Sequence, residues 1–106
     1  MNMINIERLK PRAAEAVALM KALANPHRLM ILCELLKGER SVGALEQAVE
    51  LRQSPLSQHL AKLRRDGLVA TRRESQTIYY SVADPGVTKV ITVLHDLYCK
   101  PARRKR

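Results

Sequence analysis

Aromatic side chains are scarce in this sequence of 106 residues, which contains three tyrosines and neither phenylalanine nor tryptophan. Because 46% of the residues are hydrophobic, disorder throughout is excluded and aliphatic side chains must form the core. Two cysteines are too few for the disulfide scaffold of a small secreted domain, and the amino terminus lacks the apolar run of a signal peptide. No apolar run approaches the roughly 20 residues of a membrane-spanning helix. We therefore expect one compact domain in a reducing cytoplasm.

The usual motifs of enzymes are also missing. Ser57 and His59 lie too close on one expected helix to act as a nucleophile and its base, and no glycine-rich phosphate loop or carboxylate pair is present. The sequence therefore predicts neither an enzyme nor a bound cofactor. Few tyrosines also mean few platforms for stacking bases, which disfavours a module that binds RNA or single-stranded DNA.

Positive charge, in contrast, is abundant and unevenly placed. Lys and Arg number 19 against 10 Asp and Glu, so the net charge is +9, which predicts a polyanionic partner. Residues 1–50 carry a net charge of +1 and residues 51–106 carry +8. We divide the chain into a folded domain, residues 1–99, and a basic flexible tail, residues 100–106. Seven basic against four acidic side chains remain in residues 51–99, so the folded part is basic as well.

The first two thirds of the chain predict four helices. Asn25 and Ser54 each precede a proline, which is typical of an N-cap followed by the first helical residue, and Ser41 can cap a further helix. The expected helices span 11–23, from Pro11; 26–37, before Gly38; 42–50; and 55–65, before Asp66 and Gly67. Helical spacing predicts which side chains of the last three of these helices face inward. They are Leu29, Leu32, Cys33 and Leu36 in the second helix, Val42, Leu45 and Val49 in the third, and Leu56, Leu60 and Leu63 in the fourth.

A β-hairpin and a last helix follow. Residues 68–73 and 77–82 are β-prone and are joined by the polar segment 74–76. Asp84 and Pro85 open a helix whose apolar stripe contains Val87, Val90, Ile91, Leu94 and Tyr98, whereas Val93 and Leu97 lie off this stripe. A small domain covers only one face, so we expect this helix to pack against a second copy as well. The predicted fold is mainly α with a small hairpin: a winged helix-turn-helix that forms a homodimer.

The fourth helix and the hairpin carry side chains that suit DNA. Glutamine can bond adenine edges, serine can bond several bases, and lysine or arginine can contact phosphate. On or beside the helix these candidates are Gln53, Ser54, Ser57, Gln58, His59, Lys62, Arg64 and Arg65; on the hairpin they are Arg72, Arg73 and Gln76. A solvated polar helix face and an ordinary charged hairpin are the alternatives. The order of helices and wing favours binding of double-stranded DNA.

Three segments carry a resemblance to a known family: ALANPHRLMILCELL, SVGALEQAVELRQSPLSQHLAKLRRDGLV and RRESQTIYYSV. Over residues 13–99 the chain resembles the ArsR-type winged-helix repressors. This resemblance implies that the first and last helices form the dimer interface. It also implies that two copies of the fourth helix enter successive major grooves of a palindromic operator.

Many members of that family sense metals, but the ligand pattern is poor in this chain. The position of their Cys-x-Cys pair holds Ser41-Val42-Gly43-Ala44, which lacks thiols. On the last helix Asp84, His95 and Asp96 are present, but Gly86 and Lys100 are not ligands. A tetrahedral zinc site needs four converging donors. We therefore expect no metal site, with a metal-responsive repressor as an alternative.

The two cysteines resemble those of the persulfide- and redox-sensing branch of the family, through the segments ILCELL and LHDLYC. The resemblance implies that a reactive sulfur species or oxidant bridges Cys33 and Cys99 reversibly and so switches operator affinity. Lys100 and His95 near Cys99 favour its thiolate, which predicts Cys99 as the attacking thiol and Cys33 as its resolving partner. Free cysteine is often a small buried hydrophobe, so purely structural cysteines are the alternative.

Overall fold

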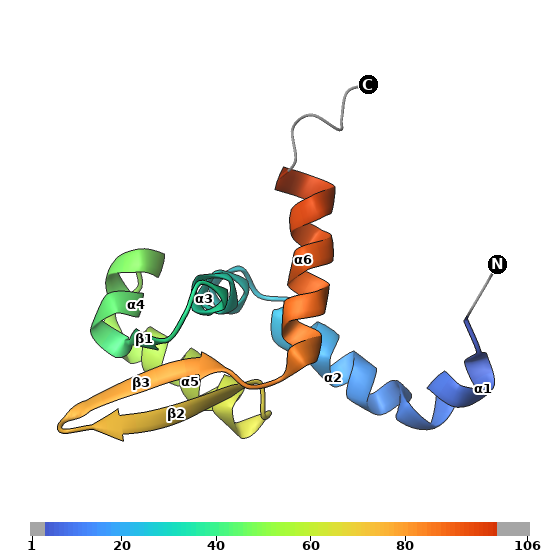
Figure 1. Cartoon of the computed structure of the whole chain (residues 1–106), viewed down its shortest axis with the longest axis horizontal. Helices are drawn as coiled ribbons and strands as arrows, with labels where there is room; N and C mark the ends of the chain where they lie inside the picture. Colours follow the sequence, from blue (N-terminus) through green and yellow to red (C-terminus); the bar gives the residue numbers. More distant parts are fainter. Residues whose placement is uncertain (1–3, 100–106) are drawn as a thin grey trace.

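The structure, a computed structural model, describes residues 4–99 and is mostly helical (Figure 1). The expected tail, residues 100–106, lies outside the described residues. The elements, in order, are α1 (Ile6–Leu9), the 3-10 helix η1 (Lys10–Arg12), α2 (Ala13–Leu23), α3 (Pro26–Leu36), β1 (Arg40–Ser41), α4 (Val42–Val49), α5 (Gln53–Arg65), β2 (Val69–Glu74), β3 (Thr77–Val82) and α6 (Pro85–Cys99). The predicted winged helix-turn-helix order is confirmed. No helix in residues 4–99 has both the length and the apolar character needed to span a membrane.

Aliphatic side chains form the core, as the composition predicts. The buried residues come from α2, α3, α4, α5, β2 and α6, together with the turn before β2, and none of the buried residues described is polar or charged. They are Ala22, Leu23, Ile31, Leu32, Leu35, Leu45, Leu56, Leu60, Leu63, Leu68, Val69, Val87 and Ile91. Because each fully buried leucine or isoleucine stabilises the fold by about 1.5–3 kcal/mol, this core needs no aromatic residue.

Three of the predicted helix caps are confirmed. The side chain of Asn25 accepts hydrogen bonds from the backbone N–H of His27 at 2.9 Å and of Arg28 at 3.1 Å. Ser41 accepts from the N–H of Ala44 at 3.2 Å. Asp84 likewise accepts from Gly86 at 2.8 Å. Local capping chemistry therefore determines where α3, α4 and α6 begin.

Two predicted helix starts are wrong for the same reason. Ser54 is not an N-cap, because α5 begins at Gln53 and its N-cap is Arg52, which makes no side-chain capping bond. Pro11 does not open a helix either, since it lies in η1, between the unpredicted α1 and the start of α2 at Ala13. Proline fits anywhere in the first turn, where the backbone N–H groups have no helical partner. It therefore marks the first turn but not its first residue.

The predicted inner face of α3 is confirmed but incomplete. Leu32 is buried, and Leu29, Cys33 and Leu36 are half-buried and pack against the core. Ile31 and Leu35, which lie off the predicted stripe, are buried as well. Helix α3 contacts α2, α4, α5, β3 and α6. A central helix with neighbours on several sides buries more than one stripe, so simple periodicity does not identify all of its inner residues.

The sheet has three antiparallel strands in the order β1-β3-β2. The turn of the hairpin is Ser75 and Gln76 alone, because Glu74 pairs with Thr77, and Ser75 adopts the left-handed φ of 58°. The hairpin is thus tighter than predicted, since two-residue turns with positive φ match the twist of the strands. Strand β1, which was not predicted, is too short to show any periodicity and exists only through its pairing with β3.

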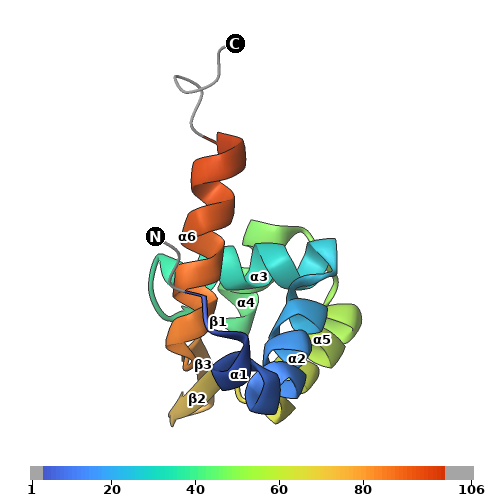
Figure 2. The same ribbon diagram turned by 90° about the vertical axis from the view of Figure 1, so that its right-hand side faces the viewer.

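Helix α6 extends beyond the other helices and strands, as Figures 1 and 2 show from two directions. Val87 and Ile91 near its start are buried in the core. Tyr98, predicted on the same inner stripe, is 80% exposed because the helix has left the core by that point. Val93 and Leu97 are 55% and 58% exposed. The carboxyl-terminal half of α6 therefore shows apolar side chains that this one chain does not cover.

Candidate functional site

Helices α4 and α5 form the helix-turn-helix, and α5 presents a polar face outward. Leu56, Leu60 and Leu63 are buried, so the remaining sides of α5 face solvent. The predicted contacts Gln53, Ser54, Ser57, Gln58, Arg64 and Arg65 are all exposed. Lys62 is less free, because its ammonium pairs with the Asp66 carboxylate at 3.6 Å. The outer face of α5 thus combines base-reading amides and hydroxyls with a basic carboxyl-terminal end.

A groove separates the amino-terminal half of α5 from the hairpin. It brings together Gln53, Ser57 and Gln76, which are far apart in the sequence. Its remaining lining residues are Ser41, Val42, Gly43, Thr77, Ile78 and Tyr80. Thr77 and Tyr80 were not among the predicted site residues, although strand alternation could have placed Tyr80 on the same face as Ile78. The groove residues offer amides and hydroxyls but no charged side chain.

His59 lies differently from the other predicted residues of α5. It is half-buried, and its ring centroid lies 5.7 Å from that of His27 on α3. Burial lowers the pKa of His59, and the nearby charges of Arg28 and His27 lower it further. These surroundings favour the neutral form of the His59 ring over the charged form.

The two predicted arginines of the hairpin have different surroundings. Arg72 donates hydrogen bonds to both carboxylate oxygens of Glu39, each at 2.8 Å, and also pairs with Glu74 at 3.1 Å. This pairing raises the pKa of Arg72 and lowers the pKa of Glu39. Arg73 is exposed and forms no ion pair with any residue in the range 4–99. Of these two cations, Arg73 is the more available to a phosphate.

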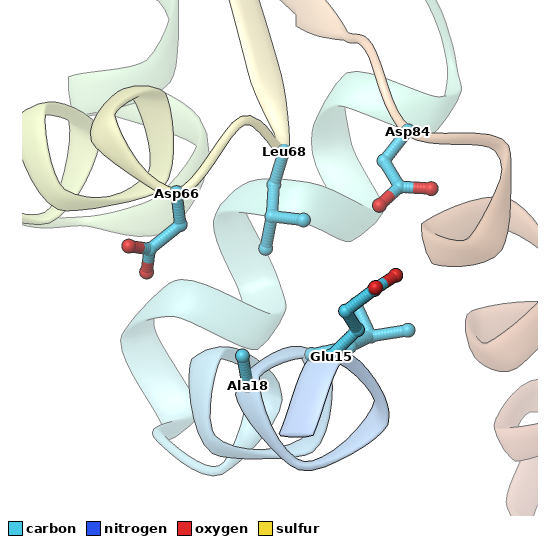
Figure 3. Close-up of a pocket in the computed structure, with 6 residues that line it drawn as sticks. Glu15, Ala18, Asp66, Leu68 and Asp84 are labelled. Carbon is cyan, nitrogen blue, oxygen red and sulfur yellow. The ribbon is translucent and has the colours of Figure 1, made fainter. Parts of the chain in front are cut away.

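Three carboxylates surround a pocket between α2, the end of α5 and the start of α6 (Figure 3). Each already has a partner. Glu15 pairs with Arg12 at 2.6 Å, Asp66 pairs with Lys62, and Asp84 caps α6. Across residues 4–99, no group of three or more histidine, cysteine or acidic side chains is positioned to hold a metal ion.

The two cysteines lie on helices that pack together. Cys33 is half-buried on α3, Cys99 is exposed at the end of α6, and both are free thiols. Burial raises the pKa of Cys33, and the charges of Cys99 and Glu34 raise it further, against a smaller opposite effect of Lys37. The helices that carry the two thiols, α3 and α6, thus bring residues that are distant in the sequence into one packed unit.

Large exposed apolar side chains lie on α1, α2 and α6, and at Ile4, two residues before α1. We call this set the apolar face. It consists of Ile4, Ile6, Leu9, Val17, Met20, Val93, Leu97 and Tyr98. Large exposed apolar residues are typical of a surface to which another molecule can bind.

Comparisons with known proteins agree with this geometry. The model of the bacterial regulatory protein, arsR family, matches residues 25–71, which run from the cap of α3 into β2. The transcriptional activator HlyU of Vibrio cholerae is 53% identical over 97 residues, which cover 92% of this chain and 90% of HlyU.

Solved structures are similar as well. The transcriptional repressor BigR from Xylella fastidiosa superposes with a TM-score of 0.87 and 38% identity, over 92% of this chain and 99% of that chain. The homodimeric winged helix-turn-helix domain Mb0332 from Mycobacterium bovis gives a TM-score of 0.72 at 33% identity, over 92% of this chain and 94% of that chain. HlyU is described as a transcriptional activator, BigR as a transcriptional repressor and Mb0332 as a possible regulator of the same family, in agreement with the prediction that the chain is not an enzyme. The chain thus belongs to the arsR family of bacterial regulatory proteins and is a transcriptional regulator.

Proposed function

We propose that this regulator binds a palindromic DNA operator as a homodimer, and that a bridge between Cys33 and Cys99 weakens this binding. The observation that carries the proposal is the placement of two free thiols on α3 and α6, which are helices that pack against each other. Helix α3 also contacts α5, so a bridge would join the last helix to the support of the DNA-binding face.

Binding to duplex DNA is supported by the exposed side of α5 and by the net charge of +9. An α-helix fits the major groove, where glutamine and serine side chains can bond base edges. The exposed arginines Arg64 and Arg65 can neutralise phosphates at the groove edge. A candidate wing, β2 and β3, lies beside the same helix.

Dimerisation is supported by the apolar face. A two-fold dimer would cover Val93 and Leu97 with the same residues of a second copy. Such a dimer carries two α5 helices and therefore binds two half-sites. The similar domain Mb0332 is described as homodimeric.

The chemistry of bridging follows from the unequal exposure of the thiols. Cys99 is exposed, whereas burial raises the pKa of Cys33, so Cys99 attacks first and Cys33 resolves. The Cys99 thiolate attacks the outer sulfur of an organic persulfide RSSH, giving a Cys99 persulfide and releasing RSH. The Cys33 thiolate then attacks the inner sulfur, and HS⁻ leaves. Overall, RSSH and two thiols give one disulfide, RSH and hydrogen sulfide, with the departing sulfur accepting two electrons. A Cys99 carrying more than one added sulfur would leave a polysulfide bridge instead.

The test combines mass spectrometry with DNA binding. The reduced protein first selects a palindromic duplex from a random library, and the protein is then treated with glutathione persulfide or with hydrogen peroxide. We expect the bridged form to bind that duplex about 5- to 150-fold more weakly, the size of typical allosteric coupling. Cys33→Ser and Cys99→Ser should bind like the reduced protein before and after treatment.

Two outcomes would contradict parts of the proposal. If treatment weakened DNA binding equally in the wild type and in both serine variants, the cysteines would have only a structural role. Absence of duplex binding by the reduced protein at low salt would remove the DNA-binding function itself.

A further inference from the structure

Of the two arginines of the hairpin, Arg72 has the more hydrogen-bond and ion-pair partners. Its Nε and Nη2 donate to the two oxygens of Glu39 at 2.8 Å each, and its Nη1 donates to Glu74 at 3.1 Å. Its guanidinium carbon also lies 4.7 Å from the centre of the Tyr79 ring. All three nitrogens therefore have an acceptor, and one face of the group rests on an aromatic ring.

These contacts cross the whole sheet. Arg72 on β2 pairs with Tyr79 on β3, and Tyr79 pairs with Ser41 on β1, so the three residues form one row. Glu39 lies two residues before Ser41 and thus on the same side of the row. We name Glu39, Arg72 and Tyr79 the wing strap. Because β1 runs directly into α4, the wing strap connects the hairpin to the start of the helix-turn-helix.

A phosphate would compete poorly for Arg72. The guanidinium already holds a carboxylate in the two-pronged geometry that a phosphate would also use. Glu39 and Glu74 together bring two negative charges to one positive charge, so the local field repels an anion. The surroundings of Arg72 are those of a structural ion pair.

Arg73 lies on the other side of the hairpin. It pairs with Ile78, which lines the groove toward α5, and side chains of paired residues share one face of a sheet. It is exposed and has no ion-pair partner in residues 4–99. A DNA strand that passes between α5 and the hairpin would therefore meet Arg73.

We propose that Arg72 is a positioning residue, which holds the wing in place relative to α4 and α5 through the wing strap, and that Arg73 is the wing cation that binds phosphate. This inference rests on the proposed binding of duplex DNA. It revises the expectation that both arginines contact DNA.

Glu39→Gln separates the two roles by the sign of its effect. If Arg72 bound phosphate, removal of the competing carboxylate would free it and raise the affinity for DNA. If Arg72 positions the wing, the same change loosens the hairpin. The hairpin must then be ordered when DNA binds, and the free energy that this requires lowers the affinity. We expect Glu39→Gln to weaken operator binding by about 3- to 10-fold, although it makes the protein more positive.

The salt dependence of binding gives the second readout. The slope of log K against log salt counts phosphates neutralised by cations, at about 0.9 for each contact. We expect Arg72→Gln to weaken binding like Glu39→Gln without changing this slope, and the double variant to be no weaker than either single one. Arg73→Gln should reduce the slope by about 0.9. Tyr79→Leu removes the aromatic ring on which the Arg72 guanidinium rests. Tyr79→Phe keeps this ring and is the control.

Hydrogen exchange in the free protein tests the wing strap without DNA. Amides of β3 that pair with β1 and β2 should exchange faster in Glu39→Gln and Arg72→Gln, but not in Arg73→Gln. Unchanged exchange, a gain or no loss of affinity in Glu39→Gln, or a slope lowered by Arg72→Gln would each overturn the inference. If the wild type fails to bind duplex DNA, the proposed function fails, and the exchange data alone still decide whether the wing strap holds the hairpin.

Discussion

Helices α5 and α6 have similar inner faces but opposite outer faces. Both bury aliphatic residues in one core: Leu56 and Leu60 from α5, and Val87 and Ile91 from α6. Outward, α5 presents amides, hydroxyls and arginines, whereas α6 presents Val93, Leu97 and Tyr98. The inner stripe determines how a helix packs within its own chain. The outer face determines what a helix can bind, and we propose a polyanion for α5 and the apolar surface of a second copy for α6.

The largest effect is expected from charging the outer face of α6. Val93→Asp combined with Leu97→Asp should give a monomer, because two carboxylates cannot be buried without partners. Loss of two-site binding should weaken operator affinity by about 10²- to 10⁴-fold. Sedimentation velocity and operator titration measure both effects. Thr88→Asp, at an exposed position of the same helix, is the control and should remain dimeric. A dimeric double variant would mean that α6 is not the interface.

Shortening a buried side chain on the inner face of α5 should lower the stability of the fold. Leu60→Ala removes a side chain that is 1% exposed, so the free energy of unfolding should fall by about 2–5 kcal/mol. Urea unfolding at a fixed protein concentration measures this change. Ala61→Ser, on the exposed side of α5, should alter stability by less than about 0.5 kcal/mol. Equal effects of the two changes would show that α5 is not packed as the structure has it.

The outer face of α5 should control sequence preference. Gln58→Ala is expected to weaken binding to the selected palindrome by about 5- to 150-fold, because a two-bond contact to a base contributes about 1–3 kcal/mol of discrimination. Binding to a scrambled duplex should not change. Gln47→Ala, at an exposed position on α4, provides a matched control. A uniform loss on both duplexes would assign Gln58 to the DNA backbone.

The smallest effect is expected from single phosphate contacts. Arg65→Gln should lower the slope of log K against log salt by about 0.9, with a similar relative loss on every sequence. Lys89→Gln removes the same charge from an exposed position on α6 and should leave the slope unchanged. Equal slopes in these two variants would mean that the basic end of α5 does not touch DNA.

Wherever short-range chemistry is sufficient, the sequence alone determined the structure. The caps Asn25, Ser41 and Asp84 bond backbone groups two or three residues away, so the few residues around each cap are enough to predict it. The inner stripe of α5 follows from its strict helical spacing, because one face of that helix is polar throughout. The family resemblance and the polar face of α5 likewise follow from the residue types and their order along the chain.

Tertiary structure alone decided the contacts between segments that are distant in the sequence. The pairing of β1 with β3 and the hydrogen bond from Arg72 to Glu39 join residues that are far apart in the sequence. The residues around each partner do not predict these contacts. The contact between α3 and α6, the helices that carry Cys33 and Cys99, likewise depends on the packing of the core. The physical reason is that periodicity and capping report only neighbours along one element. Which elements meet, and which cation is already paired, depends on burial of the whole core.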